Sequence, residues 1–548
     1  MRKNLIKSRW FAKFLAIVLS VLMLPMLPLT AQAEEGSLTL IWWEGEDGVE
    51  KGVSKGNGTF EIPKIRAHED GKVFAGWYIE NDFSRGKAAP TLSGGFGFEN
   101  GQFVTFPDVF SGIVKEETYY ARWIDPASNI KTFVTYDGDK SVELGYSLES
   151  GIDIIDEDGE PVDFAVYNLL TDGPVFKDLN QNGSLDLYED WRLSTEDRAA
   201  DLAAQLIADK EDGIHQIAGL MLYSAHQMSW VSSIPLQSQI EFLVNDDLRH
   251  VLIAGSADAN NPGNSKDEEV NMGLHARWNN NIQTIAEGLG FGIPANNSSD
   301  PRHGTSSVST AEFYTANTGV SAWPSSLGLA ATFDPAITKE FGKIASLEYR
   351  AMGIATALSP QIDIATDPRW GRFNGTFGED PLLASDMARA YVDGFQTTYD
   401  EDDNSTGWGM GSVNAMIKHW PGGGAGEGGR DAHYNYGKYA VYPGGNWKAH
   451  LIPFVDGSLS LKDGTGMASA VMPYYTISYM QVPGSEPNSA DDAGAELNMA
   501  NAYSDYMING VLREAYEYEG VVCTDWNVVG PTLEPGGMMF DPDLPGMI

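Results

Sequence analysis

The second half of the chain carries five clusters of charged and aromatic residues, each placed after an apolar stretch. The members that could take part in chemistry are Asp300, Arg369, Lys418, His419, Tyr475, Asp525 and Trp526. Carboxylate, guanidinium, ammonium and imidazole groups hydrogen-bond hydroxyls in fixed directions, and an indole ring stacks on the C–H face of a sugar. If the clusters meet in the folded chain, they predict a pocket for an uncharged, polyhydroxylated ring.

Asp525 is the candidate for bond-making chemistry. It follows residues 520–524, a small and mostly β-branched run that predicts a strand buried on both faces. An acidic residue at the carboxyl end of a barrel strand lies where parallel α/β barrels carry their chemistry. There it could serve as a nucleophile, with Arg369 and Lys418 lowering its pKa. The alternative is that Asp525 caps a helix or forms a turn.

Helical and strand patterns alternate from Ser194 onward and must position these residues. The patterns predict helices at 196–208, 276–287 and 336–352, and extended segments at 217–223, 355–364, 413–417 and 468–472. This many β-then-α units favour an α/β fold with a (β/α)8-type, TIM-like barrel over an open doubly wound sheet. A dinucleotide site has no support, because no Gly-x-Gly-x-x-Gly follows the first strand.

The order of the motifs resembles glycoside hydrolase family 3, the retaining β-glucosidases and their relatives, from about Val175 to the end. The motifs are Asp367-Pro-Arg-Trp-Gly-Arg372, Gly378-Glu-Asp-Pro381, Lys418-His419 and Thr524-Asp-Trp526. The resemblance implies an exo-acting β-glucosidase-like hydrolase that releases terminal nonreducing β-D-glucosyl residues through a covalent intermediate on Asp525. It also implies that Asp300, Arg369, Lys418, His419 and Tyr475 hold the sugar, with Trp526 beside the nucleophile.

Retention needs a second acid to protonate the leaving oxygen. Family members usually carry that glutamate on a further domain, and the chain stops at Ile548, so we expect a barrel incomplete at its C-terminal end and a fragment not fully active alone. Single-domain relatives that cleave N-acetylglucosaminides use an Asp-His pair, and Asp431 with His433 stands in a comparable place. Alternatives are a noncatalytic surface carbohydrate-binding protein, or a β-xylosidase or β-N-acetylglucosaminidase with the same barrel.

A possible calcium loop precedes the barrel. Residues 178–189 place oxygen ligands at positions 1, 3, 5, 9 and 12 with glycine at 6. The ligands would be Asp178, Asn180, Asn182, Ser184, Asp186 and Glu189. A solvated turn without metal is the alternative. Calcium would be structural, and no cofactor for catalysis is expected.

The N-terminal third predicts export and a small β domain. Residues 1–33 combine basic residues, an apolar run and an A-x-A site, as in a secretory signal peptide. An uncleaved membrane anchor is the alternative, because the apolar run is fairly long. Residues 34–125 alternate aromatic and polar residues and resemble an internalin-type β-grasp repeat, which implies attachment to a cell wall or surface; an inert β domain is the alternative. Residues 126–174 are predicted to be a linker, and residues 175–548 the barrel domain.

The composition of the chain limits the classes of molecule that it could bind. The net charge of −40 repels nucleic acid and anionic lipid but is indifferent to a neutral oligosaccharide or β-glucoside. We therefore expect no nucleic-acid partner and no membrane association after signal cleavage. The single cysteine, Cys523, excludes an internal disulfide and is predicted to be a packed residue of a secreted, extracellular or cell-surface bacterial protein.

Overall fold

The computed structural model describes most of residues 36–525. The described segments are 36–56, 59–61, 66, 68–78, 96–99, 102–105, 109–110, 113, 115–125, 130–163, 173–210, 212–226, 235, 237–253, 272–304, 320–479, 481 and 499–525. The predicted signal peptide and Trp526 lie outside them. No helix of the described segments combines the length and the apolar character that crossing a bilayer requires.

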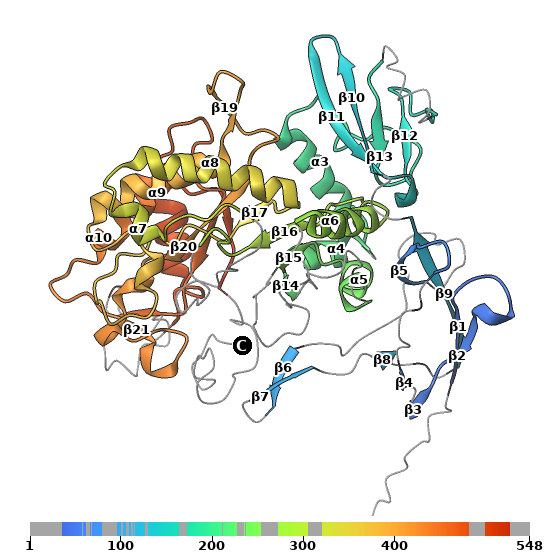
Figure 1. Ribbon diagram of the computed structural model, residues 1–548, viewed down its shortest axis with the longest axis horizontal. Coiled ribbons are helices and arrows are strands. Elements are labelled where there is room, and N and C mark those ends of the chain that lie inside the picture. The colour runs from blue at the N-terminus through green and yellow to red at the C-terminus, as the bar shows by residue number, and fades with distance from the viewer. Residues whose placement is uncertain are drawn as a thin grey trace, which may run out of the picture.

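The N-terminal residues form short strands, in agreement with the predicted all-β character (Figure 1). One sheet has the order β2 (Val49–Lys51), β1 (Ser37–Ile41), β9 (Glu116–Ile124), β5 (Val73–Tyr78), with β1 and β9 parallel. Shorter pairings join β3 (Ser54–Gly56), β4 (Thr59–Glu61) and β8 (Val109–Phe110), and β6 (Phe96–Glu99) with β7 (Gln102–Thr105). Buried aromatic rings hold the sheet together, with Trp42 and Trp77 centroids 4.5 Å apart. The β-grasp likeness stays a prediction.

Residues 126–174 are more than the predicted linker. They contain the hairpin of β10 (Lys131–Asp137) and β11 (Lys140–Tyr146), and β12 (Asp153–Ile155) pairs with β13 (Phe176–Asp178). Alternate residues of these strands bury a separate cluster that includes Phe133, Tyr146 and Ile154. The linker interpretation was wrong because these short runs pack against one another and against Val175 and Leu179, contacts that composition does not reveal.

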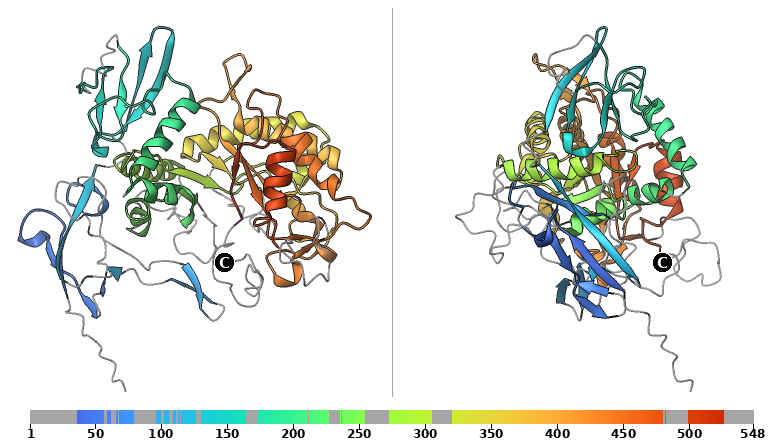
Figure 2. Two further views of the ribbon diagram at one scale, coloured as in Figure 1. Left: turned by 180° about the vertical axis from the view of Figure 1, so that it is seen from behind. Right: turned by 90° about the vertical axis from the view of Figure 1, so that its right-hand side faces the viewer.

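Seven parallel strands form the centre of the second half of the chain. They are β14 (Tyr223–His226), β15 (His250–Ile253), β16 (Asn296–Ser299), β17 (Thr356–Ala357), β20 (Asn414–Trp420), β22 (Ala470–Pro473) and β24 (Val521–Val522), paired in chain order. A helical segment follows each of the first six, as Figures 1 and 2 show. This parallel, sequential sheet fits the predicted TIM-like barrel.

Helices precede and connect these strands, and those at Thr195–Ala208, Met272–Glu287 and Pro335–Met352 agree closely with the three predicted ones. The connecting helices are α5 (Gln237–Val244), α6 (Met272–Glu287), α8 (Pro335–Met352), α9 (Pro381–Gln396) and α10 (Trp447–Ile452), with α3 (Thr195–Ala208) and α4 (Gly213–Leu220) before the sheet and α7 (Ser326–Ala330) before α8. Two segments, Pro453–Ser458 and Tyr506–Ala515, are π-helical. Small strand pairs decorate the connections: β18 (Thr398–Tyr399) with β19 (Ser405–Gly407), and β21 (Tyr439–Ala440) with β23 (Ile477–Ser478).

Local sequence explains where the long helices begin. The Asp334 carboxylate accepts the N–H of Ala336 at 3.0 Å, and Pro335 follows at the first helical position of α8. Asp380 does the same for α9 by accepting the N–H groups of Leu382 and Leu383, both at 2.9 Å. Asp380 of the Gly378–Pro381 motif is therefore a helix cap.

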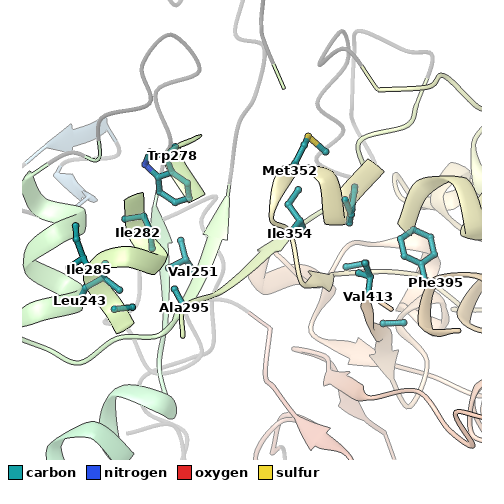
Figure 3. Packing of buried hydrophobic residues seen from close by; sticks show 14 of the residues in the cluster. Leu243, Val251, Trp278, Ile282, Ile285, Ala295, Met352, Ile354, Phe395 and Val413 are labelled. Atoms are coloured by element: carbon teal, nitrogen blue, oxygen red, sulfur yellow. The ribbon is translucent and has the colours of Figure 1, made fainter. Parts of the chain in front are cut away.

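A continuous apolar core fixes the strands against the helices. Figure 3 shows side chains of α6, such as Trp278 and Ile282, close to Val251 of β15. Phe395 of α9 and Val413 before β20 belong to the same buried cluster. Packing of this kind holds the strand ends in fixed relative positions, as a site built from several strands requires.

Two local predictions were wrong. The segment 217–223 is mostly helix α4, because its apolar residues also suit one face of a short helix. The strand before Asp525 is not buried on both faces, since Val521 of β24 is 61% exposed. Among the described strands β24 pairs with β22 alone and lies at an edge of the sheet.

Candidate active site

The predicted site residues lie at neighbouring strand ends. Asp300 follows β16, Lys418 and His419 lie in β20, Tyr475 follows β22, and Asp525 follows β24. The strands run parallel, so their carboxyl ends share one edge of the sheet. The contacts described below connect Asp300 with Lys418, and Asp525 with both His419 and Tyr475.

Lys418 and Asp300 form a buried ion pair across two strands. The Lys418 ammonium donates to Asp300 Oδ1 at 3.0 Å, and the two side chains are 4% and 13% exposed. Tyr349 donates its hydroxyl hydrogen to the backbone carbonyl of Asp300 at 2.9 Å. A buried pair of this kind is held in one geometry because either charge alone would be costly.

His419 is neutral, and its hydrogen bonds define its tautomer. Its Nδ1 lies 2.7 Å from Asp363 Oδ2, and Arg372 lies 3.0 Å from its Nε2. Because a guanidinium can only donate, Nε2 must be the acceptor and Nδ1 must carry the hydrogen. Burial, reinforced by the positive charge of Arg372, holds the pKa of His419 well below its ordinary value.

Asp363 positions this histidine and was missed by the sequence interpretation. It is fully buried and accepts three hydrogen bonds, from the His419 ring, from the His419 N–H at 2.9 Å and from the Gly423 N–H at 2.6 Å. Burial raises its pKa on balance, against the effect of these bonds. The available signal was a carboxylate inside the otherwise uncharged segment 355–364, which apolar packing alone does not explain.

The arginine at the site is Arg372, which corrects the prediction for Arg369. The Arg369 side chain is 73% exposed and donates back to the Asp367 carboxylate at 2.6 and 3.0 Å. Arg372 is only 7% exposed. Burial alone would lower its pKa, but Tyr474, Asp525, Asp431 and Asp363 surround it and raise the pKa overall.

Asp525 lies within this cluster, only 7% exposed. Its Oδ2 is 3.8 Å from His419 Nε2, and its backbone N–H donates to the carbonyl of Pro473 at 3.3 Å. Tyr475 hydrogen-bonds its carboxylate; burial, then this negative charge and bond, raise the pKa of the Tyr475 hydroxyl well above its usual value. With Arg372 in the same cluster and the Tyr475 hydroxyl bonded to it, the Asp525 carboxylate is held in place for nucleophilic attack.

Asp431 and His433 form a dyad next to the cluster. The His433 ring lies 2.5 Å from Asp431 Oδ1 through Nδ1, and Trp370 donates to the other oxygen at 3.1 Å. Burial would raise the pKa of Asp431, but the His433 hydrogen bond and charge lower it strongly. The His433 ring centroid lies 5.1 Å from that of Tyr475. Tyr475 thus contacts both His433 and the carboxylate of Asp525.

A cavity of about 450 Å³ lies elsewhere, between the β10–β13 strands and α6. Tyr146, Lys177, Trp191 and Glu287 are among its lining residues, and none of the charged cluster around Asp525 is. We place the active site at the cluster because several charged groups are buried and mutually oriented there. Such an arrangement costs stability and is typical of functional sites.

The predicted calcium loop folds as a turn closed by its own hydrogen bonds. Asp178 accepts the N–H groups of Asn182 and Gly183 at 3.0 and 2.9 Å, and the amides of Asn180 and Asn182 donate to Asp186. No group of three or more His, Cys, Asp or Glu side chains in the described segments is arranged to hold a metal ion. The oxygen donors do suit calcium, provided that both amides turn their oxygens inward.

Comparisons with known proteins show which family the chain belongs to. The family model "Glycosyl hydrolase family 3 N terminal domain" matches residues 227–539, more than half of the chain. A "Periplasmic beta-glucosidase/beta-xylosidase" of Dickeya chrysanthemi is 34% identical over 383 residues, 68% of this chain and 51% of the relative. "Beta-glucosidase C" of Emericella nidulans is 38% identical over 259 residues, 47% of this chain and 37% of the relative.

A solved β-N-acetylglucosaminidase of glycoside hydrolase family 3 from Paenibacillus sp. str. FPU-7 aligns with a TM-score of 0.42 at 22% identity, covering 57% of this chain and 49% of that one. The chain spans about half the length of the Dickeya relative and less than half of the Emericella one. The match of the family model over more than half of the chain is decisive: the chain belongs to glycoside hydrolase family 3, through the N-terminal domain of that family.

Proposed function

We propose that the protein is an exo-acting β-glycosidase of the β-glucosidase type that retains configuration through a covalent intermediate on Asp525. The observation that carries the proposal is the buried cluster in which Asp525 meets Tyr475, Arg372 and His419. Relatives named β-glucosidase and β-xylosidase support the same chemistry.

Each residue of the site has a separate role in the proposed reaction. Lys418 and Asp300 bind hydroxyls of the terminal sugar, while the Asp525 carboxylate attacks its anomeric carbon. The bond from that carbon to the leaving oxygen breaks, and protonated His433 donates a proton to this oxygen while Asp431 stabilises the imidazolium. Water then replaces Asp525, with His433 accepting its proton, so two inversions give net retention.

Covalent trapping tests this proposal. An activated 2-deoxy-2-fluoro-β-glucoside forms the intermediate quickly but hydrolyses it slowly, because fluorine destabilises the positively charged transition state. We expect the full-length chain to gain the mass of one sugar, and peptide mapping to place it on Asp525. Labelling of another carboxylate, or hydrolysis that inverts the product, would contradict the proposal.

A β-xylosidase activity is the second candidate, since one relative is named for both activities. The two sugars differ by the hydroxymethyl group of glucose, and the contacts of Lys418 and Asp300 do not distinguish them. Comparing kcat/KM for an aryl β-glucoside and an aryl β-xyloside shows which sugar the enzyme prefers. An aryl β-N-acetylglucosaminide in the same assay tests for β-N-acetylglucosaminidase activity.

We further propose that the protein works outside the cytoplasm, attached through its N-terminal strands to a cell wall or surface. The sequence of residues 1–33 and a relative named as periplasmic support export. Cell fractionation of the producing organism, with and without residues 34–125, separates export from attachment.

Calcium binding to residues 178–189 is a third proposal, with a stability readout. Calcium that binds the folded loop better than the unfolded chain should raise the Tm by a few degrees. We expect Asp178→Asn to abolish this rise and Asp139→Asn, in the exposed β10–β11 turn, to retain it. An equal calcium response in both variants would place the ion elsewhere, and no response in the wild type would remove the site.

A further inference from the structure

Exposed aromatic side chains gather on the loop that follows the catalytic dyad. Tyr434 and Tyr436 are 38% and 64% exposed, and their rings stack in parallel, 3° apart in orientation with centroids 5.2 Å apart. Rings stacked in this way hold each other in place, so they present a rigid surface to the solvent.

The loop holds this pair close to the reacting groups. Tyr434 directly follows His433, whose ring lies 5.1 Å from Tyr475, the residue that hydrogen-bonds Asp525. The Gly437 N–H donates to the carbonyl of Tyr434 at 2.8 Å, and the Tyr434 N–H donates to the carbonyl of Asp431 at 3.2 Å. Tyr434 and Tyr436 are therefore held on the same short loop as His433, the proposed proton donor.

A second tyrosine pair involves Tyr439, which follows Tyr436 closely in the chain. Tyr439 begins β21, Tyr479 follows β23, and their rings meet edge to face at 5.9 Å. The parallel pairing of β21 with β23 joins the two segments, and Figure 1 labels β21 within this part of the chain. Tyr479 is 38% exposed. We call Tyr434, Tyr436, Tyr439 and Tyr479 the tyrosine rim.

The chemistry of the rim favours a neutral sugar chain. The flat C–H faces of β-linked sugars stack on aromatic rings, and the tyrosine hydroxyls add hydrogen bonds. Asp367 pairs with Arg369 and Glu427 with Arg430, and the Lys438 ammonium lies over the Tyr439 ring, 5.4 Å from its centroid. With a net charge of −40 on the chain, an anionic saccharide would be repelled.

We propose that the tyrosine rim binds the sugar units beyond the cleaved bond, so that the preferred substrates are neutral β-linked oligosaccharides of three or more units. This inference rests on the proposed glycosidase function, since it takes Asp525 as the point of cleavage. The terminal unit binds at Lys418 and Asp300, and the following units extend along Tyr434 and Tyr436.

Calorimetric titration tests the rim separately from catalysis. Glucose, cellobiose, cellotetraose and laminaritetraose are titrated into full-length Asp525→Asn protein, which binds without turnover. We expect at least one tetraose to bind about tenfold more tightly than glucose, as two stacking contacts would give. The double change Tyr434→Ala with Tyr436→Ala should remove this advantage, and the double change to Phe should restore most of it.

Tyr136→Ala is the matched control, because Tyr136 is 49% exposed on β10 and belongs to no part of the site. We expect it to leave the affinity ratio of tetraose to glucose unchanged. A wild-type ratio near one, a ratio unaffected by the double Ala change, or an equal loss in the Tyr136 variant would overturn the inference. Wild-type protein that neither cleaves aryl β-glycosides nor binds glucose would refute the proposed function instead, while the tetraose comparison still decides the rim.

Discussion

Replacing Asp525 with glycine is expected to lower kcat for an aryl β-glucoside by on the order of 10⁴- to 10⁶-fold, because the residue that forms the covalent bond is lost. The change also leaves space beside Tyr475 and His419. Azide should enter this space and attack the anomeric carbon of an activated β-glycoside from the face that Asp525 occupies. Attack on the activated β-glycoside restores turnover and gives an α-glycosyl azide, which product NMR identifies.

His433→Ala provides the contrast for this experiment. A proton donor matters little for a dinitrophenyl leaving group and greatly for an alkyl one, so the loss should grow steeply with the pKa of the leaving alcohol. Asp525→Gly should instead affect all leaving groups. Near wild-type activity in Asp525→Gly, or a β-configured azide product, would remove Asp525 as the nucleophile. A loss in His433→Ala that is independent of the leaving group would exclude it as the acid.

Replacing Asp363 with asparagine is expected to lower kcat/KM by on the order of 10²- to 10⁴-fold, although Asp363 touches no substrate. The Asn oxygen can still accept the N–H groups of His419 and Gly423, which both bond the same Asp363 oxygen. The amide nitrogen then faces His419 Nδ1, and the ring hydrogen must move to Nε2. There it would oppose the hydrogens of Arg372 and disturb the groups around Asp525.

Asp393→Asn is the control for a buried aspartate outside the site. Asp393, on α9, accepts the N–H groups of Lys462 and Asp463, and burial raises its pKa as it does for Asp363. Both changes should cost about 1–3 kcal/mol of stability, measured by denaturant unfolding. The Asp363 variant alone should lose activity and show a shifted pH profile of kcat/KM. Equal kinetic losses in both variants would reduce the role of Asp363 to general stability.

Parts of the fold could be read from the sequence because their causes are local. Helices α6 and α8 follow from their apolar periodicity, and an N-cap aspartate with proline marks the start of α8. Segment 217–223 shows the limit, since an apolar run of that length suits either a strand or a helix until its neighbours are known.

The sequence did not show which of the two arginines, Arg369 or Arg372, lies in the buried cluster. Asp367 captures Arg369 only two residues away, which turns that side chain toward solvent. Arg372 is thereby left as the guanidinium that enters the buried cluster. The sequence motif contains both arginines at exposed-looking turn positions, and nothing in their spacing indicates which one the backbone turns inward.

The sequence by itself determined the family, the alternation of strands and helices, and the identity of most polar residues at the strand ends, because motif order and periodicity are properties of the chain. The tertiary structure alone decided that Asp363 and Arg372 fix the tautomer of His419 beside Asp525, and that Tyr434 and Tyr436 stack at the border of the site. These relations arise when residues far apart in the chain are packed together, and burial then gives each hydrogen bond and charge its effect.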